Sequence, residues 1–153
     1  MLRSLFAAAC VAVATANDRV NNQITTTLWE LIVRDQDKQG AFGRLVEFLV
    51  GDPTYAGSRS EDGRGAVFWA MESGNMAALA LVKEVNDRAY ELQMSDKDGS
   101  GKTPVDLCGK GKCEITDKHT EKVQKEISAY KKKLEDELKA YEDDPDWVDD
   151  DEF

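Results

Sequence analysis

The stretch of sequence that decides the fold is GRGAVFWAMESGN, residues 63–75. A glycine-rich turn leads into a short apolar run, and Gly74 then ends that run. Glycine is favoured in tight turns and just after the last turn of a helix, so the stretch predicts a turn, a short helix and a second turn. Residues 76–85 follow with apolar side chains at helical spacing, which predicts a second helix.

The same pattern returns along the chain in both directions. A second glycine-rich turn, DGSGKTPVDL at residues 98–107, places Gly101 38 positions after Gly63. Upstream, the apolar residues 28–33 correspond to residues 67–71, and a second apolar face over residues 42–49 precedes a break at Asp52 and Pro53. Paired short helices that recur at a fixed period predict units that bury their apolar faces against their neighbours.

This segment resembles the ankyrin-repeat family over roughly residues 25–108. The residues that match the family's turn and helix pattern are Gly101, Thr103 and Pro104 in the last unit and Gly63, Val67, Ala70, Gly74, Asn75 and Leu79 in the middle unit. Two departures stand in the middle unit, where Gly65-Ala66 replaces the family's Thr-Pro and Phe68 replaces its His. The alternative is an unrelated helical bundle with glycine breaks. The resemblance implies an all-α fold, an ankyrin-like helical repeat stack over residues 17–115.

The resemblance also implies a binding or adaptor protein rather than an enzyme. Ankyrin-like surfaces hold folded partners with their turn tips and inner helix positions. The candidate partner-binding residues are therefore Glu61, Asp62, Arg64, Trp69, Glu72, Asp96, Lys97 and Asp98. The only histidine, His119, lies near no serine or cysteine motif, so the sequence indicates no catalytic residue and no cofactor.

A long helix is predicted over residues 116–141, with Thr116 or Asp117 as its N-cap. Its apolar residues follow at steps of three and four and form one stripe: Val123, Ile127, Tyr130, Leu134, Leu138 and Tyr141. The first half of the stripe is expected to cap the open end of the repeat stack, and the second half to overhang it. The alternative is a coiled-coil or partner-binding seam.

An acidic tail ends the chain, since eight of the twelve residues 142–153 are Asp or Glu. Charge repulsion and Pro145 predict an extended, disordered segment. This tail is expected either to bind calcium weakly or to offer Trp147 as an aromatic anchor to a basic partner, the alternative being a solubilising tail.

The two ends of the sequence predict a location in the endoplasmic reticulum lumen, or alternatively secretion. Residues 1–16 resemble a signal peptide, with Arg3 before a short apolar run and small residues at Ala14 and Ala16. The final residues, DDEF, resemble a degenerate endoplasmic-reticulum retrieval signal.

Charge and cysteine content bound the remaining possibilities. A formal charge of −10 argues against nucleic acid as a partner and favours a basic protein partner. No apolar run is long enough for a membrane span.

Cys108 and Cys113 are expected to form a disulfide in an oxidising lumen, with two unpaired thiols as the alternative. Residues 96–101 resemble the start of a calcium loop, but Leu107 stands where the bidentate Glu is needed, so no metal site is predicted.

Overall fold

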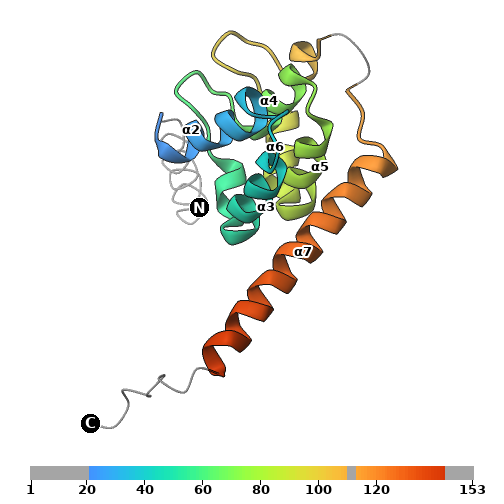
Figure 1. Ribbon diagram of the computed structural model, residues 1–153. Helices are drawn as coiled ribbons and strands as arrows, with labels where there is room; N and C mark the ends of the chain where they lie inside the picture. The colour runs from blue at the N-terminus through green and yellow to red at the C-terminus, as the bar shows by residue number, and fades with distance from the viewer. Residues whose placement is uncertain (1–20, 110–112, 144–153) are drawn as a thin grey trace, which may run out of the picture.

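The computed structural model describes residues 21–109 and 113–143, and over these residues the protein is all-α (Figure 1). The helices are α2 (Gln23–Trp29), α3 (Ala41–Gly51), α4 (Ala66–Ser73), α5 (Met76–Val85), α6 (Asp87–Met94) and α7 (Asp117–Glu142). A π-helical turn, η1 (Glu30–Arg34), continues α2, and two 3-10 turns are η2 (Pro53–Gly57) and η3 (Val105–Leu107). The expected signal peptide, Trp147 and the end of the acidic tail lie outside the described residues. No helix within the described ranges is long and apolar enough to cross a membrane.

The stretch at residues 63–75 folds as its glycines predict. Residues 66–71 of α4 are all buried, and the helix ends at Gly74, whose φ of 70° is left-handed. Asn75 then caps α5, since its side chain accepts a hydrogen bond from the backbone N–H of Ala78. Two short helices joined by two residues are therefore packed into the centre of the protein.

The two glycine-rich turns have the same geometry. In each turn the N–H of the first residue, Ser60 or Asp98, donates to the carbonyl oxygen four positions on, at 2.8 Å in both. The N–H of the glycine, Gly63 or Gly101, donates back to the carbonyl oxygen of that first residue at 2.9 and 3.0 Å. The two glycines have φ values of 81° and 82°. Gly63 and Gly101 thus occupy equivalent positions in two turns with the same hydrogen bonds.

The second turn is not followed by a helix like α4. After Pro104 the chain makes only the three-residue turn η3, and Cys108 and Cys113 then form a disulfide with Cα atoms 6.1 Å apart. The described residues therefore contain two helix pairs, α2–α3 and α4–α5, rather than a series of complete repeats. The predicted disulfide is present.

A third helix, α6, fills the chain between α5 and the second turn. Asn86 ends α5 and caps α6 by accepting from the N–H of Ala89. The side-chain amides of Asn86 and Gln93 donate to the carbonyl oxygens of Pro53 and Ala56, which anchors α6 on η2. Gln93 is 2% exposed, and its oxygen accepts from the N–H of Val67 at 3.0 Å.

Helix α2 begins at Gln23, before the apolar run at residues 28–33 that marks the first unit in the sequence. Asn22 and Thr25 form a capping box in which each side chain accepts from the other's backbone N–H at 3.0 Å. This pairing satisfies N–H groups that the first turn of a helix leaves free, so α2 starts at Gln23 despite its threonine-rich sequence.

The long C-terminal helix begins after Thr116, which caps it. Its first half packs on α3 and α5, where Val123 is 1% exposed. The contact ends near the ion pair between Lys133 and Glu47 of α3, at 3.2 Å. Figure 1 shows α7 continuing from there away from the other helices. The expected division of α7 into a packed half and an overhanging half is confirmed.

Candidate functional site

A hollow with a volume of about 660 Å³ lies between α2, the first glycine-rich turn and α4. We call it the Trp29 hollow. It is lined by Asn21, Thr25, Thr26, Trp29, Ser60, Glu61, Asp62, Arg64, Trp69 and Glu72. Five of the eight described candidate residues from the sequence therefore meet at one place.

Arg64 is the one cationic side chain that lines the hollow, and it forms ion pairs with three carboxylates, of which Asp62 is the most distant at 3.9 Å. Its Nε lies 3.0 Å from Oδ2 of Asp98, and its Nη1 lies 3.0 Å from Oε2 of Glu72. Burial acts to lower the pKa of Arg64, but the hydrogen bond with Asp98 and the charge of Glu72 outweigh it and raise the pKa. The guanidinium is therefore a charged, fixed support between the two turns and α4.

Asp98 holds Arg64 in place and does not itself line the hollow. Its side chain is 1% exposed, and Oδ1 accepts from the hydroxyl and N–H of Ser100 and from the N–H of Lys102. The Ser100 hydroxyl, followed by the backbone N–H of Lys102, holds the pKa of Asp98 well below its usual range. Asp98 is thus ionised and fully engaged in the turn, so it is a structural residue rather than the exposed turn tip that the sequence indicated.

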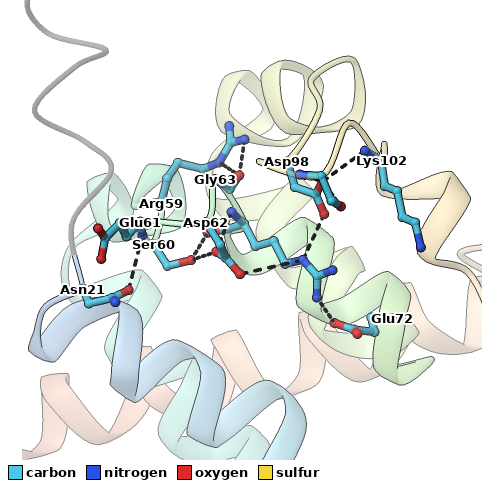
Figure 2. A network of polar contacts seen from close by, with 11 residues as sticks. Asn21, Arg59, Ser60, Glu61, Asp62, Gly63, Glu72, Asp98 and Lys102 are labelled. Carbon is cyan, nitrogen blue, oxygen red and sulfur yellow. Dashed lines mark hydrogen bonds and ion pairs between the residues drawn. The ribbon is translucent and has the colours of Figure 1, made fainter.

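The two turns are also joined through their backbones. The N–H of Gly99 donates to the carbonyl oxygen of Asp62 at 2.6 Å. The Asp62 carboxylate accepts from the hydroxyl of Ser60 and from the N–H of Arg64. On the other side, the N–H of Glu61 donates to Oδ1 of Asn21, just before α2. Figure 2 shows these contacts between Asn21 and Asp98. They fix the positions of Glu61 and Asp62, which we call the acidic wall of the hollow.

Two tryptophans supply the aromatic part of the hollow. Trp69 on α4 is 6% exposed, whereas Trp29, the last residue of α2, is 41% exposed. Sequence reasoning did not single out Trp29 as a site residue. It stands in an apolar run beside Leu28, and the pattern alone does not tell an exposed tryptophan from a core one.

Asp96 and Lys97 lie apart from the hollow. Oδ2 of Asp96 pairs with Nη1 of Arg59 at 3.2 Å, and Asp96 lines a separate depression beside Arg88 and Leu92. Arg59 is 8% exposed, and its guanidinium lies 4.9 Å from the ring centre of Phe68. This side of the second turn is built around a buried arginine.

The chemistry of the Trp29 hollow suits a cation. Three carboxylates, those of Glu61, Asp62 and Glu72, line it against the single guanidinium of Arg64. No group of three or more His, Cys, Asp or Glu side chains in the described ranges is arranged to hold a metal ion. His119 lies elsewhere, where its Nδ1 is 3.0 Å from the N–H of Thr116 at the start of α7.

The fold and the hollow define a small all-α protein with an acidic, aromatic-lined surface depression. Comparisons of the chain with protein families, with curated proteins and with solved structures find no match.

Proposed function

We propose that this protein is a binding module, ankyrin-like in design and without catalytic activity of its own, that holds a basic segment of a protein partner in the Trp29 hollow. The observation that carries the proposal is the composition of the hollow, which is lined by three carboxylates and an exposed tryptophan. An Arg or Lys side chain placed over the Trp29 ring gains a cation–π contact, and the carboxylates neutralise its charge.

The rigidity of the hollow supports this proposal. Its acidic wall is built from the first glycine-rich turn, which is hydrogen bonded to the second turn and to Asn21. A surface that is already ordered loses less conformational entropy when a partner binds. The residues that line the hollow are therefore presented in the geometry in which they bind.

The matching turns support the ankyrin-like part of the proposal. Two helix pairs and two turns with the same hydrogen bonds recur along residues 23–102. The third unit consists of the turn and η3, and α7 then covers α3 and α5. We infer a short, divergent stack that is closed by α7.

The binding proposal is tested by NMR titration of the ¹⁵N-labelled protein with a Lys- and Arg-rich peptide and with an acidic peptide of equal length. The basic peptide is expected to shift the indole N–H signals of Trp29 and Trp69 with saturable curves, and Trp29→Ala is expected to weaken binding about tenfold or more. The matched control is Leu92→Ala, because Leu92 is an exposed apolar residue on α6 away from the hollow. Equal binding of both peptides, or equal loss in both variants, would contradict the proposal.

The proposed location is the endoplasmic reticulum lumen, or alternatively the outside of the cell. The signal-like residues 1–16 and the DDEF terminus support it, and the Cys108–Cys113 disulfide suits an oxidising compartment. Imaging a tagged copy with and without Phe153 tests it. Cytosolic staining of both forms would exclude the lumenal assignment, and secretion of the form without Phe153 alone would support retrieval.

A second candidate function rests on the acidic tail, which would bind calcium at low affinity as a buffer or chaperone accessory. The supporting observation is the density of carboxylates over residues 142–153. Calorimetry on the full chain tests it when Asp149, Asp150 and Asp151 are replaced by Asn. Calcium uptake that is unchanged by these substitutions would remove this candidate.

A further inference from the structure

The last turns of α7 carry an apolar face with no partner among the described residues. We call residues 131–142 the overhang. Leu134, Leu138 and Tyr141 are 40%, 61% and 68% exposed and follow one another at steps of four and three. Side chains at this spacing lie on one face of a helix. They continue the stripe that, nearer the start of α7, buries Val123 against the protein.

We propose that the overhang pairs with the overhang of a second copy of this chain, with the two helices antiparallel about a twofold axis. This inference is independent of the proposed function, because the Trp29 hollow lies on other elements. In a twofold interface the same face is used twice, so a contact from one copy to the other is made again in reverse.

The apolar residues define the register of this pair. The axis passes close to Leu138, so that the Leu138 side chains of the two copies meet. Leu134 then faces Tyr141 of the second copy, and the reverse contact is made on the other side of the axis. The body of the protein prevents a longer overlap, because α3 and α5 already cover the first half of α7.

The order of charges along the overhang selects the antiparallel direction. The overhang opens with Lys131, Lys132 and Lys133 and ends at Glu142. Lys131 and Glu142 stand eleven positions apart, which brings them within about 20° of each other around a helix. Both side chains are exposed. They flank the apolar stripe on the same side. In this antiparallel register Lys131 and Glu142 of the other copy are offset by about three residues, or roughly 5 Å along the helix axis, which a long lysine side chain spans, whereas parallel pairing would bring like charges together.

The size of the overlap predicts a weak dimer. A helix of about twelve residues is roughly 18 Å long, so the contact is far shorter than the long helix pairs of permanent dimers. Interfaces below about 1,200 Å² are typical of transient complexes. Association is therefore expected to depend on concentration between about 10 μM and about 1 mM.

The test is sedimentation equilibrium of the full chain over this range of concentration. The average mass is expected to rise from 17.0 kDa toward twice that value. Leu138→Glu is expected to abolish the rise without loss of helix content by circular dichroism. The matched control is Leu92→Glu, because Leu92 is 59% exposed on α6 and Leu138 is 61% exposed on the overhang. A monomeric mass at every concentration in this range, as expected if the face is covered within the chain, overturns the proposal. An equal loss of association in both variants also overturns it.

Charge reversal tests the direction of pairing by a separate route. Lys131→Glu and Glu142→Lys are each expected to weaken association roughly three- to tenfold at low salt, and the two changes together to restore it. In a parallel pair, a single charge reversal would replace one like-charge contact by another. Neither single variant would then change the strength of association. Single variants that associate as well as the wild type, or a combined variant that stays weak, would therefore overturn the antiparallel arrangement.

Discussion

Arg64 and Asp98 join the two glycine-rich turns through an ion pair, with Nε and Oδ2 3.0 Å apart. The pair links residues 34 positions apart in the chain, and the Asp98 carboxylate also accepts hydrogen bonds from its own turn. The shape of the Trp29 hollow thus depends on a residue that does not line it. The two turns form one structural unit, and their contribution to the free energy of unfolding can be measured.

Acid is expected to destabilise the protein through Asp98. Its pKa is lowered in the folded state by the Ser100 hydroxyl and the Lys102 N–H, so the unfolded chain takes up the proton first as pH falls. The stabilisation is therefore complete above the ordinary Asp pKa of about 3.9 and is lost progressively below it. Urea unfolding at pH 7, 4 and 3 measures this. The difference in stability between the wild type and Asp98→Asn should shrink with acidification, and a constant difference would contradict the assignment.

Alanine at the two turn glycines should have unequal effects. Both residues have left-handed φ values, which cost a non-glycine residue about 1–2 kcal/mol. At Gly101 an added Cβ meets no atom within 4 Å, whereas at Gly63 it lies 3.3 Å from the Cα of Asp98. Gly101→Ala is thus expected to lower the free energy of unfolding by about 1–2 kcal/mol, and Gly63→Ala by more. Equal losses in urea unfolding would show that the turns do not pack on each other.

Gln93 is expected to be among the most sensitive polar positions. Its buried side chain accepts from the N–H of Val67 at 3.0 Å and donates to the carbonyl oxygen of Ala56 at 2.7 Å. Gln93→Leu removes both contacts and leaves two buried backbone groups unsatisfied, which predicts a loss of roughly 2–5 kcal/mol. The control is Gln124→Leu on the exposed face of α7, which should stay within about 0.5 kcal/mol. Chemical denaturation of the two variants gives the comparison.

The two halves of α7 should differ in their contribution to stability. Val123 is 1% exposed, so Val123→Ala is expected to lower the free energy of unfolding by about 1–3 kcal/mol through lost apolar burial. Leu138→Ala should change it by less than about 0.5 kcal/mol at low micromolar concentration, because that side chain lies on the overhang. Thermal unfolding followed by circular dichroism measures both. A large loss for Leu138→Ala would place the end of α7 in contact with the rest of the chain.

The parts of the fold that follow from local rules were predictable from the sequence. Glycines at positions 63, 74 and 101 mark turns because each has a left-handed backbone that other residues adopt at a cost. The stripe on α7 and its cap at Thr116 also follow from spacing along one helix. The start of α2 was missed because its cap depends on the pairing of Asn22 with Thr25, which outweighs the weak helix preference of three threonines.

The site was predictable only in part, because it depends on contacts between distant segments. The charged residues of the first turn stood out by their position in the repeat. Trp29 joins them from α2, which lies more than thirty positions earlier in the sequence. Asp98 looked like an exposed turn tip, yet Arg64 and its own turn bury it. Burial of a polar side chain depends on what packs over it, and the repeat pattern does not contain that information.

The uninterrupted helix beyond Lys133 acts as a spacer. From that residue to Glu142 it adds nine residues, or about 14 Å at the rise of an α-helix. Glu142, the first residue of the acidic segment, therefore lies about 14 Å along the helix from the ion pair that Lys133 makes with α3.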